Sequence, residues 1–140
     1  MTWFETRSFL THGAVMEMLR HGIARAEQIG QPQCIVIVDA SGELLGEIRM
    51  TGAKFLSRKS ALAKAMTAAS IGVPSPSVPE HVRPAIAAAT DGNMTGLPGG
   101  LPIKKDGHVL GGIGIGSGSG EQDIDVARAA LAAVGLDIDS

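Results

Sequence analysis

The sequence predicts one α+β domain in which an antiparallel sheet carries helices. Two segments have the pattern of a β-hairpin, and segments of helical periodicity precede, separate and follow them. The chain has 140 residues, the size of one domain, and 44% of them are apolar, which is enough to fill a core. Aromatic residues make up only 3%, so aliphatic side chains must form that core. We therefore expect a single domain over 1–140 with no internal boundary.

Seven segments carry the pattern of a helix or a hairpin strand. In chain order they are a short strand over 2–9, a helix over 11–29, a hairpin over 34–50, a helix over 58–71, a short helix over 79–89, a hairpin over 101–116 and a helix over 121–134. The first helix is indicated by apolar residues on one half of a helical wheel, and Gly30 followed by Pro32 ends it. The first hairpin is indicated by the β-branched run over 35–38 and the turn signal over 39–42.

The later elements are predicted from caps, prolines and turn residues. Ser57 is a suitable N-cap for the helix that follows it. Pro84 conflicts with an unbroken short helix, so we expect either a kink or a helix that starts near Pro84. Asp106-Gly107 is a strong signal for the second hairpin, whereas Pro102 limits the hydrogen bonds on one side of its strand.

Charge and composition exclude several classes of protein. The formal net charge is −2 and the pI is about 6.0, whereas nucleic-acid binding normally needs a basic face. No stretch approaches the roughly 20 apolar residues of a membrane span, and the N-terminus lacks a signal-peptide pattern. We therefore expect no nucleic-acid or membrane partner and a cytoplasmic location. Cys34 is the only cysteine, and its place before a β-branched run predicts a buried side chain.

The glycine-rich run over 111–120 lacks the spacing of a nucleotide-binding loop. It contains neither GxGxxG nor GxxxxGK[ST], so we expect no nucleotide cofactor. Glycines in a strand usually permit the close approach of another segment, here a helix. The alternative is that the amides over 117–120 bind an anion at the start of the last helix. The four histidines lie far apart in the sequence, so no metal site is expected.

Lys64 and His21 are the candidate functional side chains on the predicted helices. Lys64 lies opposite the apolar stripe of its helix among small and polar residues, which predicts that it enters a cleft. The alternative for Lys64 is an ordinary surface position. His21 lies at the border of the apolar face of the first helix, where an imidazole could ligate a haem iron. The alternative is a surface histidine paired with Glu17, four residues earlier.

Several short motifs, taken in order, resemble those of the GlcG/HbpS-like family. The matching segments are 35–42 (VVDxxG), 49–53 (RMDGA, with Thr51 for the usual aspartate), 60–68 (AxxKAxTA), 99–118 (GGxPI followed by DGxxxGxIGVSG), and Asp123 with Ala127 at the start of the last helix. Each motif alone is weak, but their joint order is specific and covers almost the whole chain.

The resemblance implies a profilin-like fold, that is, an antiparallel sheet with helices on both faces. It also implies a small-ligand-binding protein that binds haem, has a part in haem breakdown and forms homo-oligomers. A second hypothesis is a cofactor-free enzyme that acts on a small carboxylate in an aromatic or glycolate catabolic pathway. A third is a non-catalytic assembly subunit. These alternatives stay open because a shared fold does not fix function.

The ligand pocket is predicted where one loop meets two cations. The residues are Gly99, Gly100, Leu101 and Pro102 in the loop, Arg49, and Lys64 with Thr67 on the same helix. Two glycines between prolines make a stiff turn with accessible amides, which favour an anion such as a carboxylate or a haem propionate. Arg49 and Lys64 would complement the same charge, so both ligand hypotheses share this site. The alternative is that both side chains are solvated and the loop only closes the sheet.

Overall fold

Ten elements follow one another in residues 1–136, the part of the chain that the computed structural model describes. They are α1 (His12–Gln28), β1 (Cys34–Asp39), β2 (Leu44–Arg49), α2 (Ser57–Ile71), the 3₁₀ turns η1 (Ser75–Ser77) and η2 (Glu80–Val82), α3 (Arg83–Ala89), β3 (Gly100–Lys105), β4 (His108–Gly116) and α4 (Gly120–Ala133). The last four residues of the domain predicted over 1–140 lie outside the described part. Within residues 1–136, no helix is both long and apolar enough to cross a membrane.

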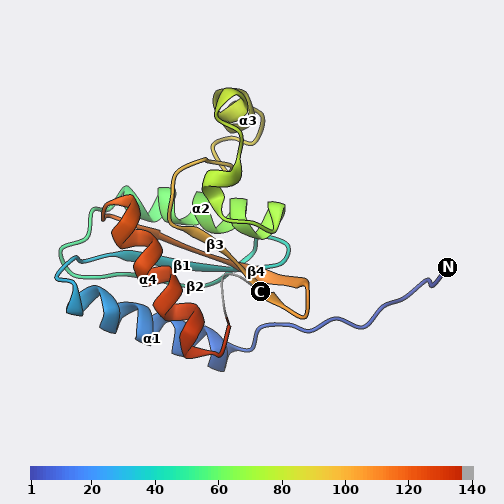
Figure 1. Cartoon of the computed structure of the whole chain (residues 1–140), viewed down its shortest axis with the longest axis horizontal. Helices are drawn as coiled ribbons and strands as arrows, with labels where there is room; N and C mark the ends of the chain where they lie inside the picture. Colours follow the sequence, from blue (N-terminus) through green and yellow to red (C-terminus); the bar gives the residue numbers. More distant parts are fainter. Residues whose placement is uncertain (137–140) are drawn as a thin grey trace.

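The four strands form one antiparallel sheet in the order β2-β1-β4-β3. Each predicted hairpin is present, and the two hairpins join because β1 pairs antiparallel with β4. In Figure 1, α2 lies over one face of the sheet, while α1 and α4 lie side by side over the other. The predicted antiparallel sheet with helices on both faces is therefore confirmed.

Alternation along β1 divides the core into two layers. Ile35 and Ile37 point to the layer that α1 and α4 cover, together with the isoleucines of β3 and β4. Val36 and Val38 point to the layer beneath the alanines of α2. Cys34 belongs to the second layer and is fully buried, as its position before the β-branched run predicted.

Glycines in β4 allow α2 to lie directly on the sheet. A Cβ added to Gly112 would overlap the carbonyl oxygen of Ala65, and one added to Gly114 would overlap that of Ala61. Both oxygens belong to the backbone of α2, so no side-chain rotation could make room. This is the close approach of a helix that the glycine-rich run predicted.

Two local predictions are wrong and one open question is resolved. Residues 2–9 form no strand but belong to an extended arm, residues 1–11, that leads away from α1 in Figure 1. Ser57 is the first residue of α2, and the cap position is held by Leu56, which makes no side-chain cap bond. Pro84 lies in the first turn of α3, where a proline costs no helical hydrogen bond.

Candidate functional site

The side chain of Lys64 reaches from α2 to the start of α4, where it meets Asp123. Lys64 is 5% exposed and Asp123 is 2% exposed. Lys64 Nζ donates to Asp123 Oδ2 over 3.1 Å and to the carbonyl oxygen of Ile115 in β4 over 2.7 Å. Lys64 is thus a buried lysine of a cleft rather than a surface lysine. Its role in ligand binding stays a prediction.

Asp123 is held by the N-terminal turn of α4. Its Oδ1 accepts a hydrogen bond from the amide of Gly118 over 3.1 Å, and a capping box between Ser119 and Gln122 begins the helix. Burial raises the pKa of Asp123 above its ordinary value, although the charge of Lys64 opposes this rise. Such a perturbed carboxylate beside a cavity is typical of functional sites.

A cavity of about 270 Å³ opens onto this ion pair, and we refer to it as the Lys64 cavity. It is lined by Lys54, Ser57, Ser60, Lys64, Leu97, Pro98, Ser117, Gly118, Gly120 and Asp123. The lining combines two ammonium groups, three hydroxyl groups and one carboxylate, and it includes the first residues of α2 and α4. Helix N-termini and lysines both favour negative charge. The cavity therefore suits a small polar anion better than a large apolar ligand.

The loop at the mouth of the Lys64 cavity is fixed by Ser75, which is fully buried. Ser75 Oγ donates to the carbonyl oxygen of Leu97 over 2.5 Å and accepts from the amide of Gly100 over 3.0 Å. Gly99 has φ +116°, and a Cβ added there would lie 3.3 Å from Lys64 Nζ. The structure therefore brings the predicted loop to Lys64. It also occupies the Gly100 amide, which is not available to an anion.

The remaining residues predicted beside Lys64 support the framework. Leu101 and Pro102 are buried in β3, with Leu101 in the layer beneath α1 and α4. Thr67 Oγ1 donates to the carbonyl oxygen of Ala63 over 2.7 Å and accepts from the amide of Thr95 over 3.0 Å. These hydrogen bonds tie α2 to the chain that leads into the loop.

Arg49 lies at the end of β2 and lines a different cavity, of about 680 Å³. Its Nε donates to the carbonyl oxygen of Ala53 over 3.0 Å, and apolar neighbours in this cavity include Ile23 and Ile48. Within one chain, the structure does not bring Arg49 and Lys64 into one site. The loop meets Lys64 alone.

The two histidines of interest lie in different surroundings. His21 is half-exposed on α1, and its Nε2 lies 3.2 Å from Glu17 Oε2, the pair that the sequence offered as the alternative. His108 starts β4 and lines a cavity of about 420 Å³ between the arm and the β3–β4 turn. We refer to this as the arm cavity; its lining includes Arg7, Phe9, Ala69, Lys105, His108 and Leu110.

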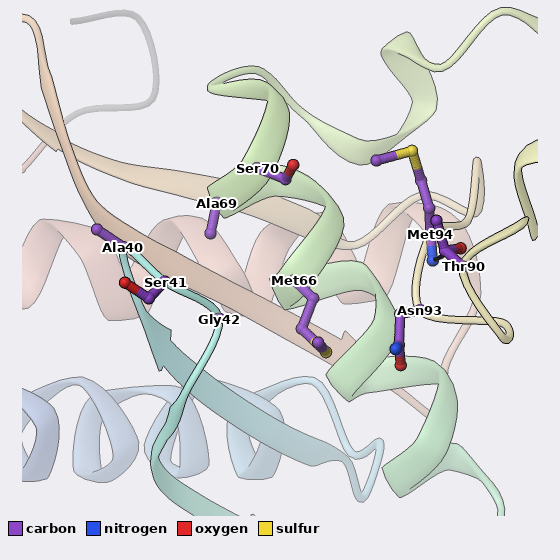
Figure 2. A pocket seen from close by; sticks show the side chains of 9 residues that line it. All are labelled: Ala40, Ser41, Gly42, Met66, Ala69, Ser70, Thr90, Asn93 and Met94. Carbon is purple, nitrogen blue, oxygen red and sulfur yellow. Dashed lines mark hydrogen bonds between the residues drawn. The ribbon is translucent and has the colours of Figure 1, made fainter.

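A fourth cavity, of about 390 Å³, lies between the β1–β2 turn and α2 (Figure 2). Figure 2 shows Ser41 on the turn, Met66 and Ser70 on α2, and Asn93 on the segment that follows α3. The Met66 side chain points into the space between these segments. No charged side chain is among its lining residues, so this cavity offers no counter-charge to an anionic ligand.

Sequence reasoning missed the two residues that organise the Lys64 cavity. Asp123 is 59 residues from Lys64, and only its match to the family motif distinguished it. Ser75 lies in a proline-rich linker whose composition predicts stiffness but no partner. No spacing in the sequence predicts that Asp123 meets Lys64 or that Ser75 meets the loop, because these contacts depend on how the helices pack on the sheet.

The fold and these cavities define a class of protein, namely a small-ligand-binding domain of the profilin-like type. The chain belongs to the family of haem degrading HbpS-like proteins, whose family model matches residues 10–132. This confirms the family that the sequence motifs resembled.

Individual proteins and solved structures of known name are also similar to this chain. It is 34% identical over 125 residues to the corrinoid adenosyltransferase PduO of Citrobacter freundii, a match that covers 86% of this chain and 37% of PduO. The chain thus spans little more than a third of that relative's length. The crystal structure of the PduOC:haem complex is 30% identical, with a TM-score of 0.86 over 93% of this chain and 98% of that chain. A double mutant of HbpS from Streptomyces reticuli is 30% identical, with a TM-score of 0.84 over 95% and 92% of the two chains.

Proposed function

We propose that this chain binds haem and has a part in haem breakdown. The proposal rests on its family and on its likeness to the PduOC:haem complex, which extends over nearly the whole chain. A haem site needs an iron ligand, apolar walls for the porphyrin and cations for the propionates. The haem site is therefore sought where an iron ligand, apolar side chains and cations lie together.

The arm cavity is the observation that carries the proposal, because its lining contains all three. His108 supplies an imidazole, Arg7 and Lys105 supply cations, and Phe9 and Leu110 supply apolar surface. Its volume of about 420 Å³ lies in the range of small-molecule sites. These residues fit haem better than the polar lining of the Lys64 cavity does.

His21 remains the second candidate for the iron ligand. Its half-exposed imidazole can be reached from solvent, and its present partner, Glu17, is a surface carboxylate that it can leave at little cost. It lies outside the cavities described above, so a haem held by His21 would lie on the outer surface of α1. The two histidines therefore predict different sites that one experiment distinguishes.

Titration of the chain with haemin is expected to produce a saturable Soret band. His108→Ala should weaken binding about tenfold or more, because the iron loses its ligand. His21→Ala tests the alternative, and His81→Ala serves as a matched control at an exposed histidine outside both sites. If only His21→Ala weakens binding, the iron lies on α1. If the wild-type chain gives no saturable band, the proposal of haem binding is wrong.

The Lys64 cavity supports a second candidate function, a site for a small carboxylate. The observation that favours it is the pair of lysines and three hydroxyl groups gathered at the starts of α2 and α4. Lys64 and Lys54 would hold the acid group, and the hydroxyl groups would bind further oxygen atoms. With Arg49 in a separate cavity, this proposal no longer uses Arg49.

Calorimetric titration with acetate, glycolate and benzoate is expected to detect binding of at least one of these acids. Lys54→Met should weaken that binding by roughly 3- to 30-fold, because it removes one exposed charged hydrogen bond. Lys59→Met, at an exposed position in the first turn of α2 and outside the cavity, should leave the affinity unchanged. Equal effects of the two substitutions would mean that only the overall charge matters, and the site would be rejected.

The proposed partners and location are those that membership of the family suggests. We propose that the chain forms homo-oligomers and acts in the cytoplasm, either as a haem-binding protein or as a non-catalytic subunit of an assembly. Self-association gives the exposed apolar residues of the arm and of β2 a function, since such surfaces commonly mark interfaces.

A further inference from the structure

Most of the aromatic residues of the chain lie in the arm, and all of those in the arm are exposed to solvent. Trp3, Phe4 and Phe9 are among only four aromatic residues in the whole sequence, and they are 83%, 92% and 80% exposed. The arm is extended but pairs with no strand of the described chain. Its residues 5–9 run beside the β3–β4 turn and Ala40, at one end of the sheet, and not along β2. Surface aromatics in this arrangement indicate a segment whose partner is elsewhere.

The outer edge of β2 is the matching open surface. β2 is an edge strand, and no described strand pairs with its outer side. Leu44, Leu45 and Ile48 are exposed along it. Leu45 is an extra residue at a bulge against β1, so regular pairing is available from Gly46 to Arg49. An edge strand with exposed apolar side chains is a template for pairing with another chain.

We infer that the arm of one copy adds antiparallel to β2 of a second copy, so that two copies exchange arms. This inference rests on the proposed self-association and names the surface that performs it. An exchanged arm takes Arg7 and Phe9 out of the arm cavity of its own chain, so of the haem-binding groups named above that cavity keeps Lys105, His108 and Leu110 in the dimer. A reciprocal exchange gives the two-fold symmetry of a closed dimer, with the same contact formed twice.

Charge fixes the register of this pairing. With Glu5 opposite Arg49, an antiparallel strand places Arg7 opposite Glu47, so both cross-strand pairs have opposite charges. A shift of two residues in either direction sets like charges against each other, Glu5 against Glu47 or Arg7 against Arg49. A shift of one residue brings charged side chains opposite uncharged ones.

The β2 side chains are in position for these pairs. Arg49 uses Nε for the Ala53 carbonyl oxygen, which leaves its terminal nitrogens without a partner within residues 1–136. Glu47 bonds to Arg58 through Oε1, so Oε2 can accept a further bond. Both side chains lie on the α2 face of the sheet, because their partners in β1 are Cys34 and Val36. Glu5 and Arg7 would join them there.

The charge pairs are tested by sedimentation equilibrium without haem. The wild-type chain should dimerise or assemble further at micromolar concentration, and Glu5→Arg should weaken this assembly about tenfold or more, because one attraction in each arm becomes a repulsion. Adding Arg49→Glu should restore most of the affinity. Glu80→Arg, the same change of charge at an exposed position outside the arm and β2, should have little effect. A monomeric wild-type chain, or failure of Arg49→Glu to rescue Glu5→Arg, would overturn the inference.

Two further measurements separate this surface from other modes of assembly. Trp3 is the only tryptophan and falls opposite Thr51 in this register, just beyond the paired residues Gly46 to Arg49, so its emission reports whether the end of the arm becomes ordered as the dimer forms. Thr6→Cys combined with Ile48→Cys should form a disulfide between copies, because the two positions lie opposite each other in this register. Thr6→Cys combined with Glu47→Cys should form none, because Glu47 lies on the opposite face of β2. Cys34 is buried and does not compete. An assembled chain in which Thr6→Cys with Ile48→Cys forms no disulfide between copies would show that self-association stands but uses another surface.

Discussion

Gly114→Ala is expected to destabilise the domain by about 3 kcal/mol or more, a large share of the stability of a small domain. The added Cβ would overlap the carbonyl oxygen of Ala61 and lie 2.7 Å from the amide nitrogen of Ala65. Both atoms belong to the backbone of α2, so only lifting the helix from the sheet makes room. Urea denaturation followed by circular dichroism measures the loss.

The control for this prediction is a glycine without such a neighbour. A Cβ added to Gly13 would lie 3.6 Å from Thr11 Oγ1, an ordinary contact, and Gly13 belongs to the first turn of α1. Gly13→Ala should therefore change stability by less than about 1 kcal/mol, in the stabilising direction. If Gly114→Ala has an effect as small as that of Gly13→Ala, α2 does not lie directly on β4.

The fold could be predicted because its signals are local. The β-branched run over 35–38 and the Asp106-Gly107 turn each specify a hairpin from a few adjacent residues. The glycine-rich run predicted a close helix contact because glycine inside a strand often marks the close approach of another backbone. The arm was mispredicted for the same reason: its alternation is that of a strand, but pairing needs a neighbour that the sequence pattern does not show.

The candidate site could be predicted only in part because its contacts are long-range. The small, polar surroundings of Lys64 on one helix face indicated a cleft, and the structure has one. The same reasoning could not exclude Arg49, because whether the end of β2 faces the loop depends on strand order and on the position of α2. The choice of Asp123 as the counter-ion likewise depends on where α4 begins relative to β4.

Lys64→Met is expected to destabilise the domain by about 3 kcal/mol at pH 7, because it leaves the buried carboxylate of Asp123 without its counter-ion. Burial already raises the pKa of Asp123, and removing the lysine that opposes this rise raises it further. A carboxyl group whose pKa is raised by folding stabilises the folded state below the pKa of the unfolded chain, about 3.9. That stability is lost as pH rises through the folded pKa. The difference between variant and wild type should therefore be small near pH 4 and grow towards neutral pH.

Asp123→Asn in the Lys64→Met background separates charge from packing. The asparagine keeps the shape of Asp123 and can accept from the Gly118 amide, but it has no charge to bury. The double variant should be more stable than Lys64→Met at pH 7 and should lose the pH dependence of the single variant. Urea denaturation at pH 4, 5.5 and 7 gives both quantities from the same samples. A deficit for Lys64→Met that is equal at all three pH values would mean that the lysine stabilises α2 and α4 through packing, and that its ion pair with Asp123 contributes little.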